Sequence, residues 1–203
     1  MTIKPEPPSR GRPRDPSIDA LVLETTRELL SEEGFAATTV QEISRRSGVH
    51  PPAIYRRWPS RLALIEDAAF SDLGEVAVRP TGDLARDLRR FVRAYARALS
   101  GPAARAAMPG LVASHQSDAT TPPEEWIHLS LRPQFYAILA AAPGDVDPEV
   151  DPDRVFDLVL GAVLAGILVP AIAQRRNHVD STVELLVRLL RPAVTARRQA
   201  TGS

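Results

Sequence analysis

The segment from residue 38 to residue 60, TTVQEISRRSGVHPPAIYRRWPS, constrains the fold more than any other part of the chain. Thr39 and Glu42 have the spacing of a capping box and predict a helix that begins just after Thr39. Gly48 predicts the end of this helix, because glycine readily adopts the left-handed conformation of a helix exit. A second helix of about two turns should follow the two prolines. Because two such short helices bury little surface between them, the segment predicts a helix-turn-helix that rests on a third helix.

The second helix of this pair carries an unusual set of side chains. We expect His50, Tyr55, Arg56 and Arg57 to face solvent, and guanidinium and hydroxyl groups are common partners of DNA phosphates and bases. The alternative is an αα-hairpin built for protein contacts. Such a hairpin would not need the basic residues and would leave Tyr55 unexplained, so the composition favours a recognition helix.

A longer stretch around this motif resembles the TetR family of transcriptional regulators. It is GFAATTVQEISRRSGVHPPAIYRRWPSRLAL, residues 34–64, and with a looser extension back to Asp15 it covers about the first third of the chain. The positions that match the family pattern are Thr39, Ile43, Gly48, Val49, Tyr55, Ser60 and Leu64. The chain departs from the pattern at His50, where a serine cap is usual, and at Trp58 and Arg61, which replace Phe and Lys.

The resemblance implies that Tyr55 contacts a backbone phosphate, and the basic composition around it supplies further candidates. Phosphates would be bound by Thr39, Arg45 or Arg46 and the N-terminal arm, and bases would be read by the exposed face of the second helix. The predicted DNA-binding residues are Arg12, Arg14, Thr39, Arg45, Arg46, His50, Pro51, Ala53, Tyr55, Arg56, Arg57 and Arg61. His50 is either free to reach a base or phosphate or an ordinary solvated loop histidine.

Residues 1–14 form a proline-rich, basic arm that cannot pack a core. Its arginines would fit a narrow minor groove, and a solubilising tail is the alternative. Asp15 and Pro16 give a helix start signal, and Gly34 should end this first helix. Phe35 is expected to fill the small core beside Val40, Ile43 and Ile54.

The pattern predicts an all-α chain with two domains. Residues 15–59 would be the DNA-binding domain, residues 60–74 a linking helix, and residues 75–203 a larger helical domain for ligand binding and dimerisation. Within the larger domain we expect helices over 83–100, within 102–116 (either continuous or broken at Pro109-Gly110), over 124–142 with a kink or interruption at Pro133, over 154–173, and after a capping box from Ser181 to Glu184.

The segment 154–173 is apolar on nearly every side. Its uncharged run is shorter than the ~20 residues that a bilayer requires, and Pro170 interrupts it, so we predict no membrane span. An all-round apolar helix must be covered all round. In the TetR family the last two long helices form a four-helix dimer interface, which implies a homodimer here. Completion of the monomer core is the alternative.

Composition narrows the remaining function classes. The chain has 25 basic and 25 acidic residues, no cysteine, and four histidines without metal-ligand spacing. We therefore expect no disulfide, no metal and no cofactor, and a cytoplasmic location. No catalytic motif or clustered Ser/His/Asp set is present, so we do not expect an enzyme.

The larger domain contains material for the effector cavity that the resemblance implies. The predicted ligand-binding residues mix aromatic surface with a few polar tips. They are Tyr95, Met108, Leu111, His115, Trp126, Phe135 and Leu164, although residues of each of these kinds are more often plain core than pocket lining. The resulting hypothesis is a ligand-responsive, homodimeric transcriptional repressor. It would bind a palindromic operator in double-stranded DNA and be released from it by an unknown small molecule. The alternative is an all-helical protein-interaction adaptor without DNA binding.

Overall fold

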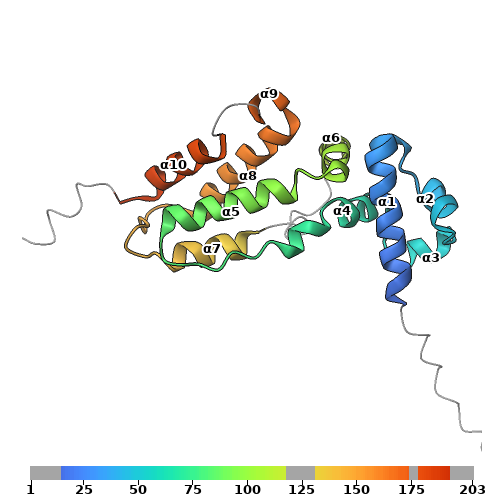
Figure 1. The fold of residues 1–203 in the computed structure, drawn as a ribbon, viewed down its shortest axis with the longest axis horizontal. Helices are drawn as coiled ribbons and strands as arrows, with labels where there is room; N and C mark the ends of the chain where they lie inside the picture. Colours follow the sequence, from blue (N-terminus) through green and yellow to red (C-terminus); the bar gives the residue numbers. More distant parts are fainter. Residues whose placement is uncertain (1–14, 118–130, 174–177, 193–203) are drawn as a thin grey trace, which may run out of the picture.

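The computed structural model describes residues 15–117, 131–173 and 178–192, and every regular element in these ranges is helical (Figure 1). The elements are α1 (Pro16–Ala37), α2 (Val40–Ser47), α3 (Pro51–Tyr55), α4 (Arg61–Ala69), a 3-10 helix η1 (Ser71–Glu75), α5 (Leu84–Ala98), α6 (Pro102–Ser117), α7 (Arg132–Ala140), α8 (Pro152–Leu168), α9 (Pro170–Ala173) and α10 (His178–Leu190). The all-α prediction is confirmed. Helices α1–α3 lie at one end of the molecule, α5, α7, α8 and α10 lie at the other, and α4 and α6 lie between them.

A small core holds the helix-turn-helix on α1 and α4. Val40 and Ile43 of α2 and Ile54 of α3 are buried in it, as predicted. Its other buried members are Val22, Leu29, Trp58 and Leu64. Ser60 caps α4, because its hydroxyl accepts a hydrogen bond from the Ala63 N–H at 3.0 Å.

Phe35 does not join this small core, so that prediction is wrong. Gly34 has φ +81°, a conformation that favours glycine, and the chain bends there before the last residues of α1. The bend carries Phe35 away from α2 and packs it against the larger core of the chain. A Cβ atom added to Gly110 of α6 would lie only 2.1 Å from the Phe35 ring, so the ring rests directly on the α6 backbone. Phe35 therefore joins the DNA-binding end to the rest of the protein.

The larger core is built around aromatic rings from three helices. Phe91 and Tyr95 of α5, Phe135 of α7 and Phe156 of α8 have ring centroids 5.7–6.5 Å apart, a spacing at which aromatic pairs attract each other. Burial raises the pKa of the Tyr95 hydroxyl to about 12. These rings hold α5, α7 and α8 as one unit.

Several helix boundaries differ from the sequence prediction. Helix α6 continues through Pro109, because its packing against α1, α4 and α8 outweighs the local cost of proline. Pro133 lies in the first turn of α7, where a missing amide costs little, and does not kink it. Helix α10 begins at His178, so Ser181 lies inside the helix and does not cap it.

Two other boundaries concern the linking helix and the last apolar helix. The linking helix α4 ends at Ala69 and is followed by η1, so it is shorter than the predicted 60–74. The predicted break at Pro170 is confirmed, since Val169 is extended between α8 and α9. Within the described ranges, no helix combines the length and the apolar character needed to cross a bilayer.

The contact between Phe35 and Gly110 gives a stability prediction. Gly110→Ala should lower the free energy of unfolding by about 1–3 kcal/mol, because the new methyl group would overlap the Phe35 ring. The measurement is urea denaturation followed by circular dichroism. Gly74→Ala is the matched control, since no atom lies within 4 Å of its added Cβ. Equal stability of the two variants would contradict the packing described here.

Candidate nucleic-acid interface

Helix α2 is fixed at both ends by the residues that predicted it. The Thr39 hydroxyl accepts a hydrogen bond from the Glu42 N–H at 3.2 Å. Gly48 has φ +70° and donates its N–H to the Ser44 carbonyl at 2.9 Å. Only half of the capping box forms, however, because the Thr39 N–H binds the Ala37 carbonyl and the Glu42 carboxylate faces two arginines. Among the described residues, the hydroxyl proton of Thr39 has no acceptor.

Helix α3 is a single turn that begins with two prolines. It spans five residues, which is shorter than the two turns predicted. His50 precedes it, is exposed and provides no side-chain cap. The first two amides are absent because Pro51 and Pro52 have none, and the next two, of Ala53 and Ile54, both donate to the His50 carbonyl. The start of α3 therefore presents side chains, and no free backbone amide, to a ligand.

The exposed face of α3 consists of His50, Pro52, Tyr55 and Arg56, whereas Ala53 and Pro51 are half-buried. Tyr55 is 53% exposed. In the part of the chain that the structure describes, the side chains of Tyr55 and Arg56 make no hydrogen bond or ion pair. Helix α3 itself lies at the end of the molecule, on the side of α1 that faces away from α6 (Figure 1).

The expectation that Arg57 belongs to this exposed face is wrong. Its side chain is only 10% exposed, and its Nε pairs with the Asp19 carboxylate of α1. Its Nη1 also donates to the Ala53 carbonyl at 3.0 Å. Arg57 thus fastens α3 to the first turn of α1 and is not available to read a base. No local sequence pattern could have predicted this pair, because the two residues are 38 positions apart.

Trp58 fastens the end of the same segment to α4. Its indole is buried, and Nε1 donates to the Asp67 Oδ2 at 2.8 Å. The phenylalanine that is usual at this position in the resembling pattern could not make this hydrogen bond. The segment of α3 and the residues that follow it, through Trp58, is therefore held by one carboxylate on α1 and another on α4.

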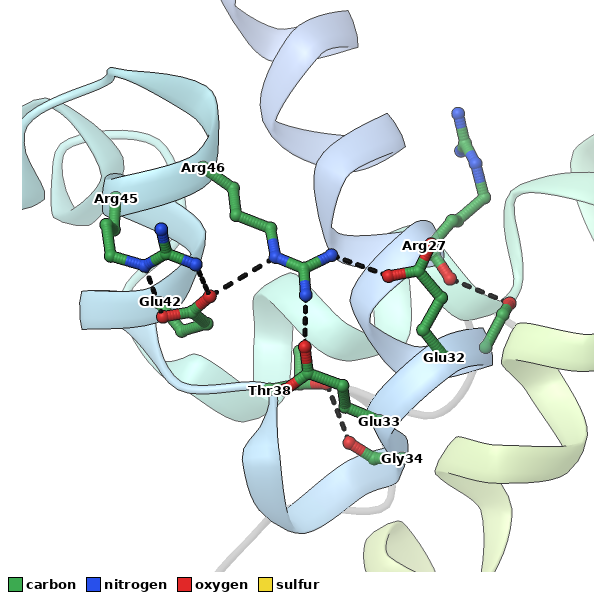
Figure 2. A network of polar contacts seen from close by, with 9 residues as sticks. Arg27, Glu32, Glu33, Gly34, Thr38, Glu42, Arg45 and Arg46 are labelled. Atoms are coloured by element: carbon green, nitrogen blue, oxygen red, sulfur yellow. Dashed lines mark hydrogen bonds and ion pairs between the residues drawn. The ribbon is translucent and has the colours of Figure 1, made fainter.

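The arginines of α2 lie in a carboxylate network (Figure 2). Arg46 pairs with Glu32 at 2.7 Å, with Glu42 at 3.2 Å and with Glu33, and its side chain is 26% exposed. Among the described residues, Arg45 pairs with Glu42 alone, and its side chain is 69% exposed. The hydrogen bond from Arg45, followed by the one from Arg46, lowers the pKa of the Glu42 carboxyl to about 2. A phosphate would thus reach Arg45 more easily than Arg46.

The Arg61 side chain is occupied by contacts with the end of α1. Its Nε donates to the Thr38 carbonyl at 2.7 Å, and its Nη2 donates to the Phe35 carbonyl. Its guanidinium carbon lies 4.4 Å from the centroid of the Phe35 ring, a cation–π contact. Burial lowers the pKa of Arg61. Arg61 therefore neutralises the carbonyl end of α1 and clamps Phe35, and the expectation of a DNA contact is not supported. Arg12 and Arg14 lie outside the described residues.

None of the predicted ligand-binding residues whose side chains the structure describes lines the cavity among α5, α6, α8 and α10. Tyr95, Met108, Leu111 and Phe135 are buried in the larger core, and Leu164 packs against it. Trp126 and the side chain of His115 lie outside the described part of the chain.

A cavity of 310 Å³ instead lies among α5, α6, α8 and α10. Its walls include Val92 and Ala96 of α5, Val163 and Ile167 of α8, and His178 of α10. Its volume falls at the lower end of small-molecule sites. The residues that form it come from four separate helices, so no local sequence pattern could have predicted it.

Two family models match this chain. Residues 22–68 match the bacterial regulatory proteins of the tetR family, and residues 78–186 match the C-terminal domain of tetracyclin repressor-like proteins. The first match covers the helix-turn-helix described above, and the second covers the cavity and most of the larger core.

Curated relatives and solved structures agree with these matches. The HTH-type transcriptional regulator Rv1556 of Mycobacterium tuberculosis is 26% identical over 187 residues, which cover 91% of this chain and 89% of that protein. YdeS of Bacillus subtilis, also an HTH-type transcriptional regulator, is 35% identical over 92 residues, or 45% of this chain and 46% of YdeS. The crystal structure of the TetR family transcription regulator SCO0332 superposes with a TM-score of 0.67 at 30% identity, covering 87% of this chain and 100% of that one.

The burial of Arg57 gives a prediction that distinguishes a structural role of this residue, holding α3 on α1, from a role in DNA contact. A double-mutant cycle with Arg57→Ala and Asp19→Ala should show a coupling of about 0.5–3 kcal/mol in the free energy of unfolding, because the two charges meet at a partly buried site. The measurement is urea denaturation of the four proteins. Arg56→Ala is the control and should leave stability unchanged. Additive effects of the two alanine substitutions would show that Arg57 is not held by Asp19.

Proposed function

The chain belongs to the TetR family of transcriptional regulators, and from this membership we propose that it acts as a homodimeric repressor. The dimer would bind a palindromic operator and leave it when a small molecule binds. The observation that carries the DNA-binding part of the proposal is the exposed face of α3, where Tyr55 and Arg56 extend from a rigidly held helix without partners among the described residues.

The side chains divide into two roles in this proposal. Tyr55, Thr39 and Arg45 would bind phosphates, because their free donors lie around the helix-turn-helix. Arg56 would read a guanine through its N7 and O6 acceptors, and His50 would lie near the same groove. Arg46 would reach a phosphate only by leaving its carboxylates, and Arg12 and Arg14 of the arm would bind the minor groove.

The homodimer is supported by apolar side chains that remain exposed in a single chain. Leu158 and Leu168 of α8 are 57% and 40% exposed, and Leu185 and Leu189 of α10 are 66% and 47% exposed. Large apolar side chains gathered on two adjacent helices mark a protein contact surface. A two-fold axis through this surface would place α8 and α10 against their copies as a four-helix interface.

The ligand response is supported by the path from the cavity to the DNA-binding end. The cavity touches α6 at Arg105, and α6 packs against both α1 and α4. A ligand that favours another position of α6 would shift Phe35 on Gly110 and, with it, the helix-turn-helix. Because the two recognition helices of a dimer must lie about 34–36 Å apart to fit successive major grooves, such a shift would weaken operator binding.

The first test is selection of bound fragments from the source genome, followed by affinity measurements on the selected site. Arg56→Ala should weaken binding about tenfold or more and relax the preference for guanine at one position of each half-site. Tyr55→Phe should weaken binding equally to all sequences, because it removes a phosphate contact. Fluorescence anisotropy at several salt concentrations measures both effects.

Arg86→Ala is the control for these measurements, since Arg86 is an exposed arginine of α5 far from α3. Unchanged affinity of both α3 variants would contradict the assigned roles. Absence of any salt-dependent DNA affinity in the parent protein would favour a protein-interaction adaptor instead.

The second test concerns the dimer. Leu185→Glu should convert the protein to monomers at micromolar concentration, because a carboxylate at the centre of an apolar interface would be desolvated without a partner. Sedimentation velocity measures the oligomeric state. Leu21→Glu, on an exposed part of α1, is the control and should leave the dimer intact. A Leu185→Glu protein that stays dimeric would place the interface elsewhere.

A further inference from the structure

The walls of the cavity are largely apolar. Val92 and Ala96 of α5 face Val163 and Ile167 of α8, and Val179 of α10 completes the lining. This surface would bind the hydrocarbon body of a small molecule through burial alone. The polar side chains at the cavity therefore decide which head group it accepts.

Two of these polar side chains have already used their hydroxyl protons. The Ser100 hydroxyl donates to the Ala96 carbonyl, and the Thr182 hydroxyl donates to the His178 carbonyl at 2.8 Å. His178 uses Nε2 in the same way, because this atom lies 3.2 Å from the Ala162 carbonyl, which can only accept a hydrogen bond. None of these three donors is left for a ligand.

The one acidic side chain of the lining is neutralised from outside the cavity. The Asp180 carboxylate accepts from Arg89 Nε at 3.2 Å and from Arg93 Nη2 at 2.8 and 3.1 Å. Two guanidinium groups thus face one carboxylate, and the local charge around Asp180 is positive.

Arg105 of α6 is the cation of the lining itself. Its Nε donates to the Ser100 carbonyl at 2.8 Å, which fixes the direction of the side chain. Its two terminal nitrogens make no hydrogen bond or ion pair within the ranges that the structure describes. A guanidinium fixed at Nε and free at its terminal nitrogens matches the two oxygens of a carboxylate.

We infer that this cavity binds an amphipathic organic carboxylate, whose head group pairs with Arg105 and whose apolar body fills the space between α5 and α8. The inference rests on the proposed ligand response and adds the chemical class of the effector. It also identifies α6 as the helix on which the bound ligand would act, since Arg105 belongs to α6 and Phe35 packs on the same helix. An organic cation drawn to Asp180 is the competing class, and the two arginines that neutralise Asp180 disfavour it.

The test uses hexanoate, octanoate and decanoate, together with the primary amides and primary amines of the same chain lengths. Isothermal titration calorimetry on the full chain should show that at least one carboxylate binds more tightly than its amide and its amine. Arg105→Gln should weaken carboxylate binding about tenfold and leave amide binding unchanged, because a charge-assisted pair is lost. Arg105→Lys should retain part of the preference.

Two control variants accompany this measurement. Arg154→Gln removes an arginine from the start of α8, with a side chain that is 84% exposed, and should change nothing. Ala96→Leu fills the cavity from α5 and should abolish binding of carboxylates and amides alike. Amides or amines that bind as tightly as carboxylates, a preference that survives Arg105→Gln, or no binding by any carboxylate would each overturn the inference.

The same proteins are then titrated onto the selected DNA fragment. Parent protein without DNA affinity would refute the proposed repressor and leave the calorimetric result standing. Octanoate that binds but does not weaken DNA binding would refute the ligand response alone.

Discussion

A helix of five residues cannot hold its own orientation, and α3 depends on the contacts at its end. Ile54 and Trp58 are buried beneath it, Arg57 pairs with Asp19 of α1, and the Trp58 indole donates to Asp67 of α4. Two carboxylates from different helices therefore determine where the exposed face of α3 points. Because one of them lies on the linking helix α4, the orientation of α3 follows that helix.

The contact between the DNA-binding end and the larger core also depends on side chains from different helices. The Phe35 ring contacts both the α6 backbone at Gly110 and the guanidinium of Arg61, which also binds the carbonyl groups at the end of α1. Residues of three helices thus meet at one aromatic ring. Because this contact is closely packed, we expect a displacement of α6 to be transmitted to α1.

Local signals in the sequence predicted local structure well. Thr39 and Gly48 mark helix ends because each acts on amides or carbonyls within four residues, and the structure confirms both. The sequence could not place Phe35 on Gly110 or Arg57 on Asp19, since these partners are distant along the chain and only the tertiary fold brings them together. For the same reason the cavity lining, which comes from four helices, was not predicted, and packing keeps α6 helical through a proline.

The paired prolines at the start of α3 have a thermodynamic consequence. Their rings fix φ near the helical value at two successive residues, so the unfolded chain has less backbone entropy to lose there. Binding to a duplex would then require little further ordering of this turn. We therefore expect association to be fast and to change little through fraying of α3 as the temperature rises. In the proposed complex, α3 would therefore enter the groove in the backbone conformation that it already has in the free protein.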